Sequence, residues 1–292
     1  MCGGPREMFI LLVGSDARRD SYEVGLADSM RLVRVDFVEP AIQILAFPRD
    51  LYVEIPGIAD SSNEITHGKL NQAFLYGNPG YNYYDGPGQG PGLLARTLEH
   101  NFGARVDHYV AVNLQTFVRI IDTLGGIDVN LPYVVDGRVR GSRDPSRYFP
   151  AGEQHLDGYR TMLLARLRPG GDLQRMEIQN LILLALADQL LSPTTLLKFP
   201  QLILSFKDSI QTDLNPTTLG QLLCLRRRLD TEKINFLSFP GTLFKSERVR
   251  DRVLGNTSIL EADFEILTEY VKRFSEGEWT QLEESVRDEF EP

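Results

Sequence analysis

Two aspartates stand where predicted strands meet loops, and their chemistry is that of a divalent-metal site. Asp16 follows the apolar run of residues 8–13, and Asp28 precedes a second strand-like run, residues 29–36. If these runs pair as antiparallel neighbours, the end of one and the start of the other share a sheet edge, and the carboxylates face each other. Magnesium binds through a couple of carboxylates, phosphate oxygens and water. The alternative is structural: Asp16 forms a turn and Asp28 caps a helix or strand.

A second group of residues is rich in side chains that bind oxyanions. Arg166, Arg168 and Arg175 surround a Pro-Gly-Gly turn, and the forked guanidinium suits phosphate oxygens. In an extended segment, Arg166 and Arg168 point the same way. Arg175 and Gln179 are four residues apart, so they share a face at the start of an apolar helix over residues 178–191, where free N–H groups favour an anion. The alternative is a set of solvated arginines, which the apolar character of the helix disfavours.

Two further cations lie in loop positions. Arg49 follows a third strand-like run, residues 41–46, and strand ends are where ligands gather in open α/β sheets. Lys69, in Lys-Leu-Asn-Gln-Ala-Phe, offers a weaker phosphate contact, and a surface lysine is the simpler interpretation. The chain has no GxxxxGK[ST], HExxH or GxSxG motif, and its four histidines are scattered. The sequence therefore argues against the phosphate-loop, zinc-protease and serine-hydrolase sites that these motifs build.

The elements that position these residues alternate between strands and helices. Glu39 and Pro40 link the second and third strands as a hairpin, and residues 77–92 form a long irregular loop. The other predicted strands are residues 107–112, 127–131 and 234–239, and the predicted helices are residues 93–102, 114–124, 158–166, 178–191, 199–209, 217–229 and 259–274. Because the hairpin argues against a purely parallel sheet, we expect an α/β fold: a three-layer α/β/α sandwich around a mixed central sheet. Residues 275–292, with Trp279, read as an acidic, solvated tail.

Composition narrows the function classes. The chain has 292 residues and a net charge of -9, which disfavours nucleic-acid binding. Six of the 31 basic residues are lysines, so arginine dominates and an oxyanion ligand is slightly favoured. Cys2 lies so near the chain start that we expect no internal disulfide with Cys224, and no metal-ligand spacing exists. No apolar run reaches the ~20 residues that span a bilayer, and the start lacks a signal-peptide pattern, so we expect a soluble chain.

The order of short motifs along the chain resembles that of LytR-CpsA-Psr domains. Eight segments carry the resemblance, in order: residues 12–16 (LVGSD), 27–30 (ADSM), 47–50 (FPRD), 69–71 (KLN), 107–109 (DHY), 124–129 (LGGIDV), 154–158 (QHLDG) and 166–179. Each segment alone is a weak signal, whereas eight in order are specific. The resemblance covers residues 9–187 and implies a catalytic domain over residues 8–274.

The resemblance implies an α/β/α sandwich that binds polyprenyl pyrophosphate, with the lipid in a hydrophobic tunnel walled by the apolar helix after Gln179. Carried over to this chain, Asp16 and Asp28 would hold Mg²⁺. The implied pyrophosphate-binding residues are Arg49, Lys69, Arg166, Arg168, Arg175 and Gln179. Arg49 and Arg175 would also be catalytic, and Asp172 would orient or deprotonate the acceptor hydroxyl.

The activity implied by the resemblance is a Mg²⁺-dependent phosphotransfer at the cell envelope. A glycan phosphate would move from a polyprenyl-pyrophosphate carrier to peptidoglycan or another wall glycan, on the outer side of the cytoplasmic membrane, which the protein would meet through its lipid substrate. Two departures stand out: Leu26 replaces an arginine usual in the family, and no N-terminal membrane anchor is seen. Hydrolysis of the pyrophosphate by water, or non-enzymatic binding of a lipid or glycan, are the alternatives.

Overall fold

The computed structural model describes residues 4–17, 22, 24–58, 65–138, 144–167, 172–190, 195, 206, 209–251 and 253–279. The chain divides into two compact units. Unit 1 comprises Met1–Val112 and Gln211–Pro292, and unit 2 comprises Asn113–Ile210.

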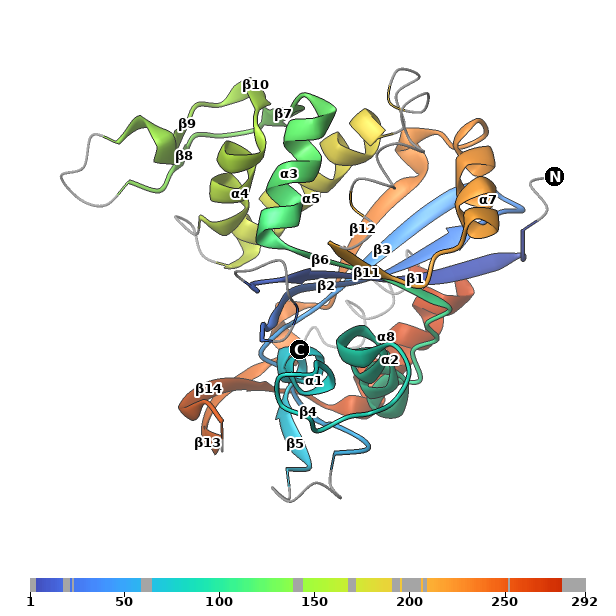
Figure 1. Cartoon of the computed structure of the whole chain (residues 1–292), viewed down its shortest axis with the longest axis vertical. Coiled ribbons are helices and arrows are strands. Elements are labelled where there is room, and N and C mark those ends of the chain that lie inside the picture. Colours follow the sequence, from blue (N-terminus) through green and yellow to red (C-terminus); the bar gives the residue numbers. More distant parts are fainter. Residues whose placement is uncertain are drawn as a thin grey trace, which may run out of the picture. The chain divides into compact units, whose positions relative to one another are not determined.

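Unit 1 is built on a six-stranded sheet with the strand order β11-β6-β1-β2-β3-β12 (Figure 1). Its strands are β1 (Glu7–Ser15), β2 (Ala27–Asp36), β3 (Ala41–Phe47), β6 (His108–Asn113), β11 (Ile210–Thr212) and β12 (Ile234–Ser238). Strand β2 runs antiparallel to β1 and to β3, whereas β12 runs parallel to β3. The sheet is therefore mixed, and the hairpin predicted between the second and third strands is confirmed.

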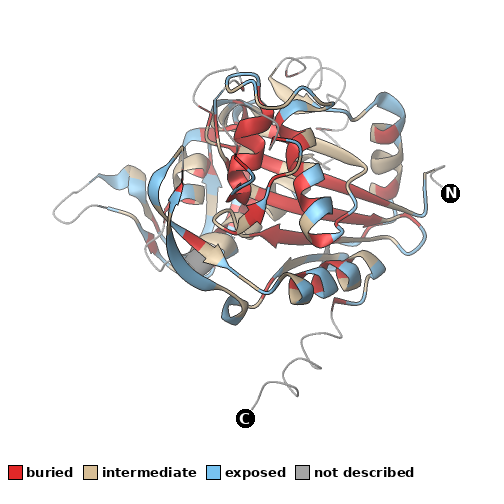
Figure 2. Cartoon of the chain, turned by 90° about the horizontal axis from the view of Figure 1, so that it is seen from below, coloured by how far each residue is buried: buried red, intermediate tan, exposed pale blue. Residues whose placement is uncertain are grey.

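Helices cover both faces of this sheet. The first face carries α1 (Leu70–Gly77), α2 (Gln89–Phe102) and α8 (Phe264–Glu276), and the second carries α7 (Pro216–Arg226) (Figure 1). Side chains alternate along the strands: Leu11 and Leu32 belong to the first core cluster, and Ile10 and Val33 to a second cluster with Leu225 of α7. The central strands β1, β2 and β3 are accordingly buried along most of their length (Figure 2). This arrangement confirms the α/β/α sandwich.

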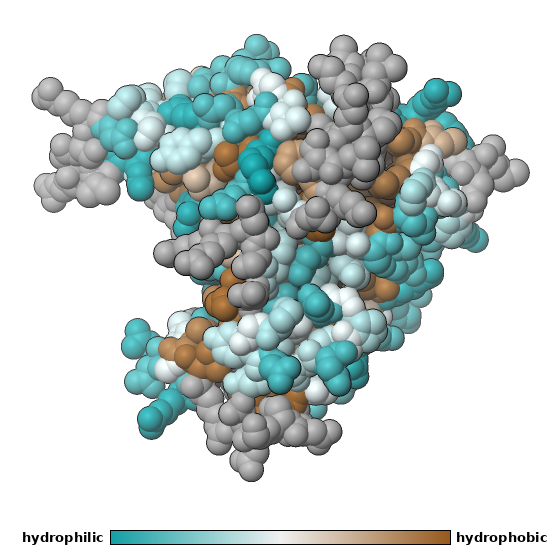
Figure 3. All heavy atoms as spheres, in the orientation of Figure 1, coloured by the Kyte–Doolittle hydropathy of each residue, from teal (hydrophilic) through white to brown (hydrophobic). Residues whose placement is uncertain are grey.

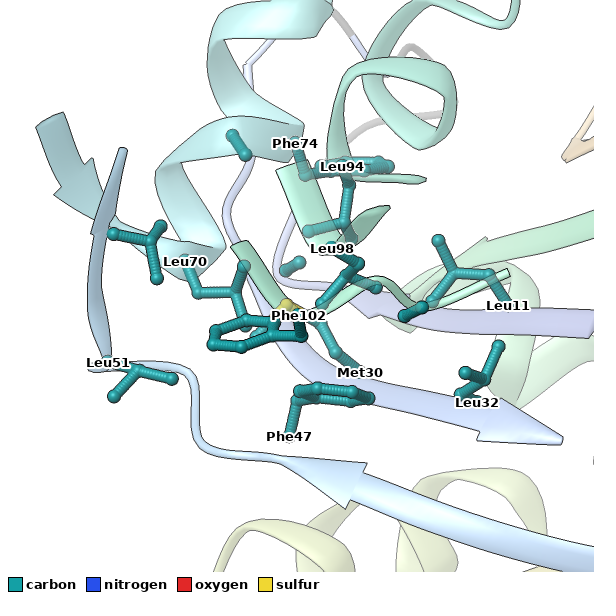
Figure 4. Close-up of a cluster of buried hydrophobic side chains, with 14 of the residues drawn as sticks. Leu11, Met30, Leu32, Phe47, Leu51, Leu70, Phe74, Leu94, Leu98 and Phe102 are labelled. Carbon is teal, nitrogen blue, oxygen red and sulfur yellow. The ribbon is translucent and has the colours of Figure 1, made fainter. Parts of the chain in front are cut away.

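The first core cluster fixes the segments next to the polar residues of interest. Its central side chains are Leu11, Met30, Leu32, Phe47, Leu51, Leu70, Phe74, Leu94, Leu98 and Phe102 (Figure 4). Leu51 and Leu70 are both 0% exposed, and burying such a side chain contributes about 1.5–3 kcal/mol. Since Leu51 follows Asp50 and Leu70 follows Lys69, the core holds the backbone of these charged residues in place.

The C-terminal part of unit 1 differs from the sequence prediction. Strands β13 (Lys245–Asp251) and β14 (Gly255–Glu261) form an antiparallel hairpin, so the helix predicted over residues 259–274 starts too early. Helix α8 begins after Asp263, whose side chain accepts hydrogen bonds from the first-turn N–H groups. Trp279 is 2% exposed and packs on Tyr270, with a ring-centroid distance of 5.0 Å. The expectation of a solvated Trp279 is therefore wrong, whereas residues 280–292 lie outside the described residues.

Unit 2 follows the sequence prediction in part. Its elements are α3 (Leu114–Leu124), β7 (Ile127–Leu131), β8 (Val135–Asp136), η1 (Pro145–Arg147), β9 (Tyr148–Phe149), β10 (Gly152–Leu156), α4 (Gly158–Arg166) and α5 (Asp172–Leu190). Helix α3 begins at Asn113, whose side chain accepts a hydrogen bond from Thr116 N, and ends at Gly125 with φ 86°. Predicted helices 114–124 and 158–166 and strand 127–131 are confirmed, while most of predicted helix 199–209 lies outside the described residues.

The cysteine prediction is wrong. Cys224, on α7, is disulfide-bonded, and the other cysteine of the chain is Cys2, which lies outside the described residues. The described start of the chain accounts for the error, because a Cβ atom on Gly4 would lie 3.3 Å from the Phe37 ring. Phe37 belongs to the same core cluster as Leu225, so Gly4, the first residue of the described part, lies near the core side of α7.

On the face shown in Figure 3, apolar and polar residues are interspersed over the part of the surface that belongs to described residues. Among the described helices, none combines the length and apolarity that crossing a membrane requires.

Candidate functional site

Asp28 is the extra residue of a β-bulge. The β1–β2 ladder is regular as far as the pair Gly14–Ser29, but the next pair is Ser15–Ala27. Two residues of β2 therefore oppose one step of β1, which reverses the side-chain alternation. Burial agrees, since Ala27 shares a core cluster with Met30 despite their odd separation. Asp28 thus lies within β2 rather than before it, and its side chain leaves the core pattern.

Asp16 lies at the same end of the ladder as Asp28, as antiparallel pairing predicted. Its N–H donates to Leu26 O (3.1 Å), and its Oδ1 accepts from Leu26 N (2.7 Å), closing the loop between the strands. Leu26 stands two residues before Asp28, so Asp16 and Asp28 lie at the same end of the β1–β2 pair. The two carboxylates therefore share one sheet edge.

The loop between β1 and β2 has close contacts that fix its path. A Cβ atom on Gly25 would lie 2.7 Å from Ser15 Oγ and 2.8 Å from Ala17 Cβ, so only glycine fits there. The neighbouring Leu26 packs partly buried against the first core cluster. At this position the side chain thus joins the core instead of supplying a cation.

Four residues form a row of alternating charge next to the bulge, which we call the charged row: Asp28, Arg49, Asp50 and Lys69. Arg49 Nη1 donates to Asp28 Oδ1 (2.5 Å), and Arg49 Nε lies 3.4 Å from Asp50 Oδ2. Lys69 Nζ donates to Asp50 Oδ1 (2.8 Å). Asp50 was not predicted as a site residue. The available signal was its position directly after Arg49 in Phe-Pro-Arg-Asp. The structure thus brings Asp28, Arg49 and Lys69 together, with the Asp50 carboxylate between the two cations.

Lys69 is 8% exposed, so the interpretation as a surface lysine is wrong. It ends β5 (His67–Lys69), which pairs with β4 (Tyr52–Glu54), and it caps α1. The backbone binds this segment to the arginine segment, because Leu70 N donates to Leu51 O (2.8 Å) and Asn71 N donates to Arg49 O (3.2 Å). The cations of the charged row are therefore positioned by main-chain hydrogen bonds as well as by ion pairs.

The carboxylates of unit 1 fit a magnesium ion in one binding mode. No group of three or more His, Cys, Asp or Glu side chains in the described part of the chain is arranged to enclose a metal. Magnesium, however, is commonly held by one or two carboxylates, with water and substrate phosphates completing its shell. Asp16 and Asp28 supply two hard oxygen donors at one sheet edge, and Oδ1 of each is oriented by a protein donor. Their metal role remains a prediction.

In unit 2, helix α5 begins at Asp172, six residues earlier than predicted. Asp172, Arg175 and Gln179 therefore occupy its first turns, and Arg175 and Gln179 share a face as expected. The side chain of Asp172 lies outside the described residues, as does Arg168.

Gln179 links α5 to the end of α4. Its Nε2 donates to Ala165 O (3.1 Å), which brings Gln179 beside Arg166, the last residue of α4. Arg166 is helical and exposed, and its Nη1 lies 4.0 Å from Met162 Sδ. Leu167 has an extended backbone, with φ −68° and ψ 145°, whereas Arg168 lies outside the described residues, so the predicted extended pairing of Arg166 with Arg168 is wrong at Arg166. The structure thus groups Arg166, Gln179 and, one turn earlier, Arg175.

Two polar pairs hold the scaffold of unit 2. Tyr133 Oη donates to Glu177 Oε2 (2.5 Å), and burial, followed by this carboxylate, raises the pKa of Tyr133 to about 12. His155 Nδ1 lies 2.7 Å from Asp128 Oδ1, and this hydrogen bond is the main cause of the raised His155 pKa. These contacts join β7 and its neighbours to α5 and β10. His155 thus has a structural role.

Comparisons with known proteins agree on one family. The family model described as the LytR_cpsA_psr family (LytR-CpsA-Psr) matches residues 5–275. The polyisoprenyl-teichoic acid–peptidoglycan teichoic acid transferase TagV of Bacillus subtilis (strain 168) is 28% identical over 236 residues, covering 80% of this chain and 56% of that protein. The transferase TagU of Oceanobacillus iheyensis is 30% identical over 217 residues, covering 73% and 61%. The chain thus spans less than two thirds of the length of either relative.

A solved structure supports the fold match. The crystal structure of B. subtilis TagV superposes with a TM-score of 0.71 at 25% identity, over 95% of this chain and 98% of that one. The similarity extends over both units, unlike the sequence motifs, which stop near residue 187.

Proposed function

This chain belongs to the LytR-CpsA-Psr family, and on that premise we propose that it transfers a glycan phosphate from a polyprenyl-pyrophosphate carrier to a cell-wall sugar hydroxyl. The observation that carries the proposal is the charged row at the bulged sheet edge. There, core and backbone fix two cations, which are the donors that bind phosphate oxygens, beside two carboxylates. The names of the relatives, transferases acting between polyisoprenyl-linked teichoic acid and peptidoglycan, support the same reaction class.

The proposed step is an in-line displacement at phosphorus. The acceptor hydroxyl oxygen forms a bond to the glycan-side phosphorus, the bond to the bridging oxygen breaks, and polyprenyl phosphate leaves. Asp172 takes the hydroxyl proton, and Arg49 and Arg175 stabilise the charge on the phosphate oxygens. Such stabilisation by preplaced donors is the main source of rate in phosphoryl transfer.

The remaining residues bind and orient the donor. Lys69, Arg166, Arg168 and Gln179 would hold pyrophosphate oxygens, with Lys69 reaching them from its place beside Asp50. Asp16 and Asp28 would hold Mg²⁺, which supplies further charge neutralisation when bound.

We place the protein in the cell envelope, outside the cytoplasm. The disulfide at Cys224 supports this location, since disulfides persist in oxidising compartments and are rare in the cytosol. The partners would be a polyprenyl-pyrophosphate-linked glycan and peptidoglycan or another wall glycan. The membrane surface would be met through the lipid of the donor.

The test is a transfer assay with a polyprenyl-pyrophosphate disaccharide and peptidoglycan fragments, with Mg²⁺ or with EDTA. We expect release of polyprenyl phosphate together with glycan attached to the acceptor, dependent on Mg²⁺ and lost in Asp28→Asn. The matched control is Asp136→Asn, which alters an ion pair with Arg138 that is just as exposed.

Each of three other outcomes would contradict part of the proposal. Release of polyprenyl phosphate without glycan attachment would mean a hydrolase. Donor binding without turnover would mean a lipid or glycan-binding module. Full transfer in EDTA would remove the metal from the proposal.

A further inference from the structure

A buried polar network connects the β13–β14 hairpin to Lys69. Asp251, the last residue of β13, is 9% exposed, and Gln72, on α1, is 0% exposed. Gln72 Nε2 lies 3.3 Å from both Asp251 oxygens and donates to Tyr76 Oη at 2.7 Å. These two side chains come from segments 179 residues apart, so the contact is tertiary. None of the proposed catalytic steps uses it.

The network fixes which way the Gln72 amide points. An amide has one acceptor end and one donor end, and the Asp251 carboxylate only accepts. Nε2 must therefore face Asp251, which directs Oε1 to the N–H of Lys69, at 2.7 Å. Asp251 thus acts on the N-cap of α1 through a single intermediate side chain.

The Asp251 carboxylate also organises its own turn. Its Oδ1 accepts from Val253 N (2.7 Å) and Leu254 N (2.6 Å). Its charge lies close behind the Lys69 strand: after burial, it is the next cause of the raised pKa of Tyr52, the residue paired with Lys69 in the β4–β5 ladder. Burying a carboxylate is costly unless it is hydrogen-bonded, and here every bond supports either the turn or α1.

We infer that Asp251 is a positioning residue: through Gln72 it sets the backbone of Lys69 and so aims the Lys69 ammonium along the charged row. This inference rests on the proposed function, in which Lys69 holds a pyrophosphate oxygen. The ammonium reaches Asp50 Oδ1 at 2.8 Å only while the Lys69 backbone keeps its cap geometry. The effect is on donor binding, because Asp251 contacts neither the charged row nor the reacting atoms.

The test compares Asp251→Asn with Asp36→Asn in the full chain. Asparagine keeps the shape but replaces one of the two oxygens that Gln72 Nε2 faces with an NH₂ group, which weakens the contact that orients the Gln72 amide and hence the acceptor of the Lys69 N–H. We expect the KM for the polyprenyl-pyrophosphate donor to rise roughly 3–10-fold, the effect of about one hydrogen bond, with kcat within about twofold. Gln72→Met removes the same link and should behave alike.

Asp36 is the matched control. It makes the same turn bonds, accepting from Val38 N and Glu39 N at 2.9 Å each, but at the β2–β3 turn. We expect its KM to equal that of the wild type.

Two further measurements do not depend on turnover. In hydrogen exchange by NMR, the Lys69 amide should be protected in the wild type and exchange faster in Asp251→Asn and Gln72→Met. Inorganic pyrophosphate should bind more weakly to both variants by calorimetry. A fall in thermal stability with unchanged KM, pyrophosphate affinity and Lys69 exchange would overturn the inference. If Asp251→Asn does not fold, Gln72→Met decides alone.

The outcomes separate this inference from the proposed function. If Lys69→Ala leaves donor KM unchanged while Arg49→Ala abolishes transfer, the inference fails and the proposed function stands. If the protein shows no turnover but the exchange and affinity changes occur, the positioning role stands and the proposed reaction fails.

Discussion

The residues assigned to the pyrophosphate are held differently in the two units. In unit 1, Arg49 and Lys69 are interlocked with carboxylates and tied by main-chain bonds between their segments. In unit 2, Arg166 has no carboxylate partner among the side chains described, and the end of α4 is held to α5 by core packing and by the hydrogen bond from Gln179 to Ala165 O. The cations of unit 1 are already paired with carboxylates, whereas the residues of unit 2 are positioned by the ends of α4 and α5.

This difference assigns the two groups separate electrostatic tasks. The unit 1 group contains three carboxylates, Asp16, Asp28 and Asp50, against two cations, so it does not attract a diphosphate by charge alone. A bound divalent cation would reverse that sign. In the unit 2 group (Arg166, Arg175 and Gln179), Arg166 contributes a guanidinium charge that no described carboxylate pairs with. Unit 1 therefore supplies precisely placed cations, and unit 2 supplies the positive charge that attracts a diphosphate.

The largest expected effect tests whether both groups are needed for transfer. We expect Arg49→Ala and Arg175→Ala each to lower kcat/KM by about 10²–10³-fold, because each removes a charged donor to the transition state. Steady-state transfer rates and circular dichroism would show lost activity in a folded protein. Arg138→Ala, which breaks an exposed ion pair with Asp136, is the control. Full activity in both site variants would refute the assignment, and in one variant would confine the site to the other group.

A smaller effect sharpens the role of helix placement in unit 2. Gln179→Ala removes the hydrogen bond to Ala165 O, worth about 0.5–1.5 kcal/mol. We expect a roughly two- to tenfold rise in donor KM, measured by initial rates across donor concentrations. If Gln179→Ala lowered kcat/KM as much as Arg175→Ala does, Gln179 would contact the reacting phosphate instead of only positioning α4.

The smallest effect tests whether polar contacts in unit 2 outside this group matter. His155 has a raised pKa, so the stability it contributes is complete below the unfolded pKa of about 6.5 and is lost as pH rises through the folded value. Because the side chain is 63% exposed, we expect no more than about 0.5 kcal/mol. Urea unfolding of His155→Gln and wild type should differ at pH 5.5 but converge by pH 8.5. A difference that grows with pH would contradict this sign.

Local signals in the sequence predicted much of the fold. Helices α3 and α4 were located to the residue because Asn113 and Asp157 cap their starts and Gly125 ends the first of them. The antiparallel pairing that brings Asp16 and Asp28 to one edge was only a condition in the sequence prediction, and the β1–β2 ladder meets it.

The errors have physical causes that act at long range. The burial of Lys69 depends on its ion pair with Asp50 and on the β4–β5 pairing, and the hydrophobic pattern of the sequence reveals neither contact. The β13–β14 hairpin carries charged residues on most positions, so its alternation was hidden, and the packing of Trp279 on Tyr270 depends on where α8 lies. The bulge at Asp28 is a one-residue change of register, invisible until the two strands are paired.

That bulge bears on how this sequence is free to evolve. The Asp28 side chain is 41% exposed, whereas the adjacent Ala27 is fully enclosed. An inserted residue of this kind lies outside the in-out pattern, so selection acts on its chemistry without disturbing the hydrophobic interior. Its flanking positions carry the opposite constraint, since deleting a residue there would turn the end of the strand inside out. Ligand preference at this edge is therefore open to single substitutions, while its length is not.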